Sequence, residues 1–566
     1  MEILYEGLIE DLASVQFEEL SSDEMSKPST SNSEVNYIHP STLSFIDKPS
    51  FLHEKRVTLK CAEVILLIIK YADPFGYCSN SKIESRQSYS TAKSYSPGQT
   101  YATRQFYATA KSYSPKQTYS TAQPYTATQS KCKVPGVCGT PTHIARSTPT
   151  PSKFKTEYEW TQLDFDYENP IDKEKDIKNK IFIPGKPAPI DVDVHYNRQD
   201  KRIFVTIPRF LPGVPATLGT ATTSKLTGQP VIKPYPSWKW HRYPEECRKD
   251  RIISVYRIKV DKCGRLWVLD TGRLSTERIC PMQILAFDLK TDELIHRKEI
   301  PNSVLHEDSI LVTPIVEIFN ENCDDTFLYI ADTVGFSIII HDVKSGAFWR
   351  ASDKTMYPYP NHSSFDILGD NFDLVDGVLG MDIGPKIAGE SRKLYYHSLS
   401  SVTENWVYTD HLRNASIFGV YPWVHPSVFN VYKGDRDSQS AAQAIDSNGI
   451  SFFGKLSKLS INCWDTTTEY GFENIDVVEH NEVTLQFPSG IKVVDNPISG
   501  QEELWVMTSR LQKVIAGTLV NDDVNFRILV TTVKDAISGT KCKGNGRFNN
   551  NVYGGTTTRK QAKSPL

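Results

Sequence analysis

A short pattern of a basic or polar residue, an apolar strand and a polar end recurs six times between residues 202 and 508, and it constrains the fold more than any other feature. Its copies are Arg202–Pro208, Arg265–Asp270, Phe327–Asp332, Lys393–Ser398, Gly449–Gly454 and Glu503–Thr508. Equivalent positions, counted from Ile203 to Leu504, are separated by 63, 62, 66, 57 and 53 residues. A nearly steady period of this length indicates small sheets that stack into one continuous core.

Further strand-like runs flank the copies. Upstream runs are Pro189–Val194, Val255–Val260 and Gly490–Val494, and downstream runs are Ile284–Asp288 and Ser337–Asp342. Turn-forming residues separate these runs. An isolated hairpin is marginally stable in water, whereas stacked sheets bury both of their faces. The sequence therefore predicts an all-β, six-bladed β-propeller.

The chain that precedes the repeats has a different composition. Residues 1–84 are acidic and Ser-rich, apart from a short apolar run at 61–69, and are predicted to be disordered. Residues 85–151 are of low complexity and carry Tyr at every sixth position from Tyr89 to Tyr125. We expect the propeller to occupy residues 152–544, followed by a flexible basic tail at 545–566.

The tyrosine repeat has two interpretations. Its phenols alternate with Ser, Thr, Ala, Lys, Gln and Pro, which cannot bury a core. Exposed phenols near lysines such as Lys93 and Lys111 suit oxidative cross-linking, which predicts a structural matrix protein. The alternative is a replicated linker without a role of its own.

Charge and cysteine content restrict the class of protein. Lys and Arg number 64 against 67 Asp and Glu, so there is no electrostatic basis for nucleic-acid binding. The sequence contains no run of 18 apolar residues, the length that would indicate a membrane span. Ten cysteines without C-x-x-C spacing, with sequons at Asn361 and Asn414, favour a secreted, disulfide-bonded glycoprotein. Cys263 and Cys280 flank the strand 265–270 and its successor, which predicts a disulfide between them.

A signal peptide is not recognisable at residue 1. The run at 61–69 follows basic residues and resembles a short, displaced signal core, which would make the gene model suspect. The alternative is a buried segment.

Polar side chains are predicted to gather at one mouth of the propeller channel, because first strands start and second strands end there. These residues are Asp270, Thr271, Asp332, Thr333, Asp376, Ser440, Ser489, Thr508 and Ser509. A buried amine needs a carboxylate or several acceptors, so this mouth suits a cationic or polar small molecule. For each Asp the alternative is a turn satisfied by local backbone N–H groups. No metal or cofactor motif occurs, and neither is expected.

Several stretches resemble the insect yellow / major royal jelly protein family. They are Val205–Arg209, Gly213–Gly219, Trp238–Trp240, Lys262–Gly272, Phe287–Leu289, Gly380–Pro385 and Leu504–Gln512. The resemblance runs from about Trp160 to Gly544. It implies a secreted six-bladed propeller that acts in pigmentation, through the melanin pathway, or in hardening of cuticle or eggshell.

The resemblance also suggests the chemistry of the channel. Some family members bind biogenic amines such as serotonin there, which implies a catechol or indole amine as partner, with the cuticle or eggshell matrix as another. Other members convert dopachrome, and that reaction needs a base of near-neutral pKa, for which Asp376 and Asp270 are the candidates. Family sequences often carry Asn at the position of Ser509 and an aromatic residue at that of Leu511, so this chain departs from the pattern at both.

Overall fold

The computed structural model describes residues 151–197, 200–418 and 426–542. The regions predicted to be disordered, residues 1–84 and the tyrosine repeat up to residue 150, lie outside these ranges. So does the predicted tail at 545–566.

Six antiparallel sheets of four strands each make up this part of the chain. From the innermost strand outward, blade 1 contains β2 (Asp191–Tyr196), β3 (Lys201–Thr206), β4 (Leu218–Thr223) and β5 (Pro230–Pro234). Blade 2 contains β6 (Val255–Val260), β7 (Arg265–Asp270), β10 (Gln283–Asp288) and β11 (Leu294–Glu299). Blade 3 contains β12 (Leu311–Ile318), β13 (Thr326–Asp332), β14 (Ser337–Asp342) and β15 (Ala347–Ser352).

The other three blades follow the same order. Blade 4 contains β18 (Val378–Ile383), β19 (Lys393–Ser398), β20 (Thr403–Tyr408) and β21 (Asn430–Asp435). Blade 5 contains β22 (Gln443–Ile445), β23 (Ile450–Lys455), β24 (Ser460–Asp465) and β25 (Ile475–His480). Blade 6 contains β26 (Pro488–Asn496), β27 (Gln501–Thr508), β28 (Phe526–Thr532) and β1 (Lys155–Trp160).

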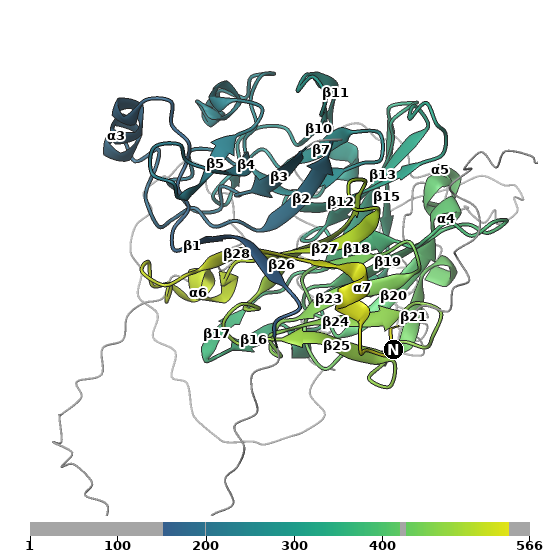
Figure 1. Ribbon diagram of the computed structural model, residues 1–566. Helices are drawn as coiled ribbons and strands as arrows, with labels where there is room; N and C mark the ends of the chain where they lie inside the picture. The colour runs from purple at the N-terminus through teal and green to yellow at the C-terminus, as the bar shows by residue number, and fades with distance from the viewer. Residues whose placement is uncertain (1–150, 198–199, 419–425, 543–566) are drawn as a thin grey trace, which may run out of the picture. The chain divides into compact units, whose positions relative to one another are not determined.

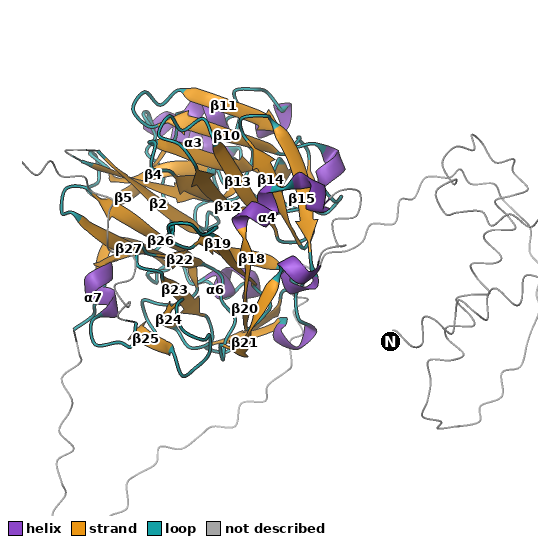
Figure 2. Ribbon diagram, turned by 90° about the vertical axis from the view of Figure 1, so that its right-hand side faces the viewer, coloured by secondary structure: helices purple, strands orange, loops and turns teal. Residues whose placement is uncertain are grey.

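The blades form a closed ring around a central channel. Each innermost strand neighbours the next, from β2 through β6, β12, β18 and β22 to β26, and β26 lies beside β2. In Figure 2 these innermost strands gather near the centre, and outer strands such as β11, β21 and β25 lie at the rim. The predicted six-bladed β-propeller is thereby confirmed, and all six copies of the sequence pattern are second strands.

Blade 6 joins the two ends of the described chain. Strand β1 pairs antiparallel with β28, from Lys155 opposite Val530 to Trp160 opposite Phe526. Just before β1, the Lys153 ammonium donates to the carbonyls of Ala536 (3.0 Å) and Ser538 (2.7 Å). The last blade is therefore completed by the first strand, and the ring is closed by backbone hydrogen bonds.

The second strands are apolar on both faces because each blade packs between two others. In β7, Leu266, Trp267, Val268 and Leu269 are all fully buried. An alternating apolar and polar pattern would leave one face of such a strand without a hydrophobic partner.

Short elements connect the strands. The helices are α3 (Pro170–Lys178), α4 (Thr409–Arg413), α5 (Ala415–Phe418), α6 (Leu511–Ala516) and α7 (Val533–Ile537). Single 3-10 turns cover Trp238–His241, Pro244–Glu246, Asn302–Val304, Lys354–Met356, Pro360–His362 and Pro426–Val428. Two small hairpins are β8 (Arg273–Leu274) with β9 (Glu277–Arg278), and β16 (Ser364–Ile367) with β17 (Asp370–Asp373). None of the helices in the described ranges is long and apolar enough to cross a membrane.

Candidate functional site

Strand starts and strand ends meet at one end of the channel, as the sequence predicts. Val255 lies opposite Asp270, Leu311 opposite Asp332, and Pro488 opposite Thr508. Helix α6 lies over this end and is held to the β16–β17 hairpin by the ion pair between Lys513 and Asp370, at 2.9 Å. Figure 1 shows α6 beside this hairpin. We call this end the α6 mouth.

The α6 mouth contains a cavity of about 410 Å³. Its apolar lining includes Phe210, Ile310, Val312, Leu374, Leu379, Phe487, Leu511, Val514 and Ile515. Its polar lining consists of Tyr256, Arg257, Thr333, Asp376 and Ser489. A mostly apolar hollow of this size with a few convergent polar groups is typical of small-molecule sites.

Asp376 is the one acid that lines this cavity among the described residues. Its main chain is fixed, because its N–H donates to Ser400 Oγ and its carbonyl accepts from Ser400 N, each at 3.1 Å. The adjacent Gly377 leaves no space for a side chain, since a Cβ there would lie 2.5 Å from the Met356 carbonyl oxygen. The chain can therefore approach blade 3 closely only with glycine at this position.

The Asp376 carboxylate itself has no hydrogen-bond or ion-pair partner in the described part of the chain. Burial without a compensating donor penalises the charged form and raises the pKa of Asp376 to about 6. This carboxylate is therefore mostly ionised at neutral pH yet remains able to accept a proton, and its residue lines the cavity.

Arg257 on β6 forms the floor of the cavity. Its Nη1 donates to Thr313 Oγ1 at 3.0 Å and to the Leu379 carbonyl at 3.5 Å. Its Nη2 donates to the carbonyls of Ala441 at 3.0 Å and Ser489 at 2.7 Å. One side chain thus connects blade 2 with the four other blades that supply these acceptors. Sequence reasoning missed this residue, although an Arg within the inner-strand run 255–260 was the signal that could have found it.

Asp270, the second candidate base, has a structural role in this fold. Its two carboxylate oxygens accept from the N–H groups of Ile253 and Ser254, both at 2.9 Å, and from Gly272 N at 3.1 Å. Gln283 Nε2 donates to it at 2.9 Å. Burial raises the pKa of Asp270 while these four donors oppose that shift. Asp270 is fully enclosed and does not line the cavity.

Asp332 occupies the equivalent position in blade 3 and is satisfied in the same way. It accepts from Ser309 Oγ at 2.6 Å, from Ile310 N at 3.1 Å and from Gly335 N at 3.0 Å. Arg350 Nη1 lies 3.3 Å from its carboxylate. For Asp270 and Asp332 the structure therefore supports the turn interpretation rather than direct contact with a ligand.

The remaining predicted residues divide into two groups. Thr333 and Ser489 line the cavity with Asp376, while Thr271, Ser440, Thr508 and Ser509 are buried nearby without lining it. Thr271 and Thr333 donate to the backbone carbonyls of Ser254 and Val378. The hydroxyls of Ser440, Ser489 and Ser509 have no partner within the described ranges.

The predicted Cys263–Cys280 disulfide is wrong. The structure pairs Cys263 with Cys323 and Cys280 with Cys247, and a third bridge joins Cys463 to Cys542. Cys263 lies in the turn before β7, whereas Cys280 precedes β10, which begins beside the far end of β7. A six-residue strand spans about 20 Å, and a disulfide requires Cα atoms within about 7 Å.

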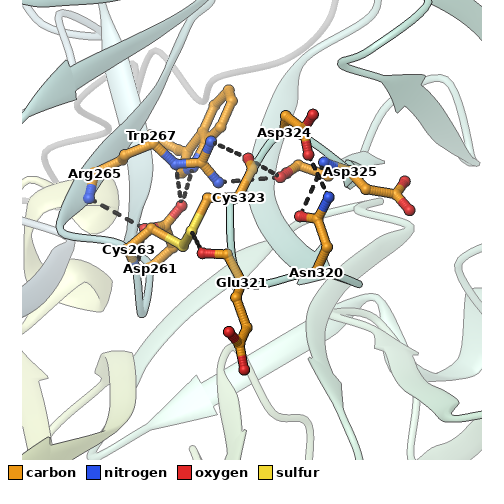
Figure 3. Close-up of a disulfide and its surroundings, with 10 residues drawn as sticks. Asp261, Cys263, Arg265, Trp267, Asn320, Glu321, Cys323, Asp324 and Asp325 are labelled. Atoms are coloured by element: carbon orange, nitrogen blue, oxygen red, sulfur yellow. Dashed lines mark hydrogen bonds and ion pairs between the residues drawn. A yellow bond between two sulfur atoms is a disulfide. The ribbon is translucent and has the colours of Figure 1, made fainter.

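The bridge that forms instead connects two blades. Cys263 in the β6–β7 turn and Cys323 in the β12–β13 turn are close because blades 2 and 3 are neighbours (Figure 3). Arg265 reinforces this contact by pairing with Asp261 at 2.7 Å and donating to the Cys323 carbonyl at 2.8 Å. This disulfide lies toward the end of the channel opposite α6.

Two further predictions concern surface chemistry. Asn361 and Asn414, the predicted glycosylation sites, are both exposed, and glycosylation there stays a prediction. Within the described ranges no three His, Cys, Asp or Glu side chains cluster as metal ligands.

A closed six-bladed propeller with a ligand-sized cavity at one channel mouth defines the class of protein. The model of the major royal jelly protein family matches residues 253–542. A dopaminechrome tautomerase of Drosophila melanogaster is 34% identical over 411 residues, covering 70% of this chain and 86% of that protein. Major royal jelly protein 9 of Apis mellifera is 32% identical (72% and 94% covered), and protein yellow of Drosophila melanogaster is 32% identical (73% and 75% covered). The chain belongs to the yellow / major royal jelly protein family.

Proposed function

We propose that the protein is a secreted, pigmentation-related member of this family that binds a small catechol- or indole-type amine in the α6-mouth cavity. The observation that carries this proposal is the Asp376 carboxylate, which is ionisable and unpaired in an apolar space. The ligand's role would be in melanin formation or in hardening of cuticle or eggshell.

The lining matches the chemistry of such a ligand. An ammonium group would pair with Asp376, and the pairing would be strong because little water competes for it. The aromatic ring would lie among Phe210, Phe487 and the ring of Tyr256. The Ser489 hydroxyl, which has no protein partner in the described residues, would meet a ring oxygen or ring N–H.

Isomerisation of an oxidised catecholamine is the second candidate, favoured by the pKa of Asp376 at about 6. One relative is named a dopaminechrome tautomerase. In a tautomerisation of this type the carboxylate would remove a proton from a ring carbon, the electron pair would move into the ring, and a quinone oxygen would gain a proton. A base with a pKa near the working pH is suited to this transfer.

Secretion is part of the proposal and is supported by the covalent structure. The described residues contain three disulfides, which persist in oxidising compartments. Exposure of Asn361 and Asn414 is compatible with glycosylation along the same route.

Calorimetric titration of the purified full chain with serotonin and dopamine tests binding, and the absorbance of added dopaminechrome tests turnover. Asp376→Asn should weaken amine binding at least tenfold. If the protein is an isomerase, the same variant should lower turnover by about 10²–10⁴-fold. Asp373→Asn is the matched control, because Asp373 is an exposed acid on β17 outside the cavity lining.

The outcomes separate the functions. Saturable heat without accelerated loss of dopaminechrome identifies a binding protein, and accelerated loss identifies an enzyme. If Asp376→Asn behaves like wild type in both assays, the proposed site is wrong. If wild type gives neither signal, the cross-linked matrix function of the tyrosine repeat becomes the leading explanation.

A further inference from the structure

The mouth of the channel opposite α6 contains a second cavity, of about 510 Å³, with a different lining. It is bounded by the far ends of the inner strands, with Asp193, Lys259, Asp382 and Arg392 among its lining residues. Arg257 closes the floor of the α6-mouth cavity, and Lys492 forms an ion pair with both carboxylate oxygens of Asp191 (2.7 and 2.8 Å) in the channel interior. The two mouths are therefore distinct sites.

The buried acids of the opposite mouth are already satisfied by backbone donors. Asp193 accepts from the N–H groups of Val194 and Val260, both at 2.8 Å. Asp382 accepts from Ile383 N at 2.9 Å and from Ile445 N at 2.7 Å. Each carboxylate thus uses both oxygens to tie its own strand to the neighbouring blade.

Of two further lining side chains, Asp261 is already hydrogen-bonded and His195 is uncharged. Asp261 is held by Arg265 and Trp267. Burial lowers the pKa of His195, so that its ring is neutral at pH 7. The remaining acid of the lining, Asp495, is exposed at the rim.

Three cations line this mouth, of which Lys262 is exposed, and the other two, Lys259 and Arg392, have unused donors. No hydrogen bond or ion pair within the described ranges holds the Lys259 ammonium, and the hydrogen bond formed by Arg392 uses Nε, which donates to the Gly384 carbonyl at 2.7 Å. Burial lowers the pKa of Lys259, but the carboxylates of Asp382 and Asp193 together raise it by more. The pKa therefore lies above its usual value, and the ammonium group is charged. Arg392 acts on Lys259 in the opposite direction, as a nearby like charge does.

We propose that the opposite mouth binds a small oxyanion, a phosphate or carboxylate group, between Lys259 and Arg392. Lys259 comes from blade 2 and Arg392 from the β18–β19 turn of blade 4, and the apolar side chains of Ile315 and Val316 from blade 3 line the same cavity. Two cations facing one space repel each other, and an anion with several acceptor oxygens removes that repulsion and fills the open donors. Asp382 and Asp193 attract Lys259, and Glu317 and Asp382 attract Arg392, but none of these carboxylates accepts a hydrogen bond from either cation in the described ranges, so the N–H donors stay open.

The test is calorimetric titration of the full chain with inorganic phosphate and, separately, succinate, at constant ionic strength set with chloride. Wild type should bind at least one of the two saturably. Arg392→Gln should weaken that binding at least tenfold, and Arg392→Lys, which keeps the charge, should retain most of it. The matched control is Lys290→Gln, because Lys290 is an exposed lysine in the β10–β11 turn and should leave binding unchanged.

Binding of phosphate alone would identify a phosphate ester as the ligand class, and binding of succinate alone would identify a carboxylate. Absence of binding by either anion, or equal affinities of wild type and Arg392→Gln, would overturn the proposal. The titration with amine at the α6 mouth should be unchanged in Arg392→Gln, so the two sites are tested separately.

Discussion

Blades 2 and 3 differ from blades 4 to 6 at the α6 mouth, although all of them place polar residues there. In blades 2 and 3, Asp270 and Asp332 are each surrounded by three or more donors. On the side of blades 4 to 6, the Asp376 carboxylate and the hydroxyls of Ser440 and Ser489 have no partner within the described ranges. A disulfide joins blades 2 and 3 at the other end of the channel.

This comparison separates acids that hold the fold from an acid that is available to a ligand. An Asp at a strand end stabilises a propeller when the first-strand N–H groups of its own blade point at it. Asp376 lies two residues before β18 rather than at the end of a second strand, and the neighbouring N–H groups are used elsewhere. Blades 2 and 3 therefore use their acids to hold the fold, whereas blade 4 supplies the free carboxylate of the cavity.

Replacement of Asp332 and of Asp376 by Asn should change the free energy of unfolding in opposite directions, and this is the largest difference that we expect. Asp332→Asn should lower the free energy of unfolding by about 3–5 kcal/mol, because it leaves Arg350 and several donors without a charged partner. Asp376→Asn should raise the free energy of unfolding by about 0.5–2 kcal/mol at pH 7.5, because it removes an uncompensated charge. Urea unfolding of both variants measures this, and effects of the same sign would abolish the distinction between the two sides.

Removal of the Cys263–Cys323 disulfide between blades 2 and 3 should have the next largest effect on stability. The double variant Cys263→Ser with Cys323→Ser opens a loop of 60 residues, which should lower the free energy of unfolding by about 2–4 kcal/mol. Amine affinity at the α6 mouth should stay the same, because the bridge lies at the other end of the channel. A loss of affinity comparable to that of Asp376→Asn would show that blades 2 and 3 contribute to amine binding directly.

Acid should weaken amine binding through Asp376. The pKa of Asp376 is about 6, so the carboxylate is ionised at pH 7.5 and becomes protonated as the pH falls through 6. The apparent dissociation constant should rise about tenfold per pH unit below pH 6, measured by calorimetry between pH 7.5 and 5. In Asp376→Asn this dependence should disappear.

Protonation of Asp376 also changes the free energy of unfolding in a direction that can be derived. The pKa of Asp376 in the folded protein lies above its usual value of 3.8. The folded state therefore takes up a proton before the unfolded chain does as the pH falls from 7 toward 4. The stability advantage of Asp376→Asn over wild type should decrease over this interval, and an advantage that grows would contradict the raised pKa.

A single hydroxyl should give the smallest effect. Ser489→Ala should weaken catechol or indole binding by about threefold to tenfold, the value of one hydrogen bond, with the free energy of unfolding unchanged to within about 0.5 kcal/mol. Ser509→Ala is the matched control, since Ser509 also has an unpartnered buried hydroxyl in the described structure but does not line the cavity. Equal affinities of the two variants would exclude Ser489 from ligand contact.

Much of the fold and part of the candidate site were predictable. The six copies of the pattern identified every second strand, because a blade packed on both faces needs apolar residues at consecutive positions. The rule that strand starts and ends meet at one mouth placed Thr333, Asp376 and Ser489 together. The rule did not distinguish them from Asp270 and Asp332, because their hydrogen-bond donors cannot be assigned before the loops are folded.

The sequence by itself determined the number of blades, the class of fold and the end of the channel where polar groups gather, since these follow from local patterns repeated at a steady period. Only the tertiary structure decided which carboxylate is free, which cysteines pair and how Arg257 joins five blades. Each of those outcomes depends on partners far apart in the sequence, such as Cys263 with Cys323 or Arg257 with Ser489. Closure of the ring brings such partners together, and a local residue pattern does not specify which distant residues will meet.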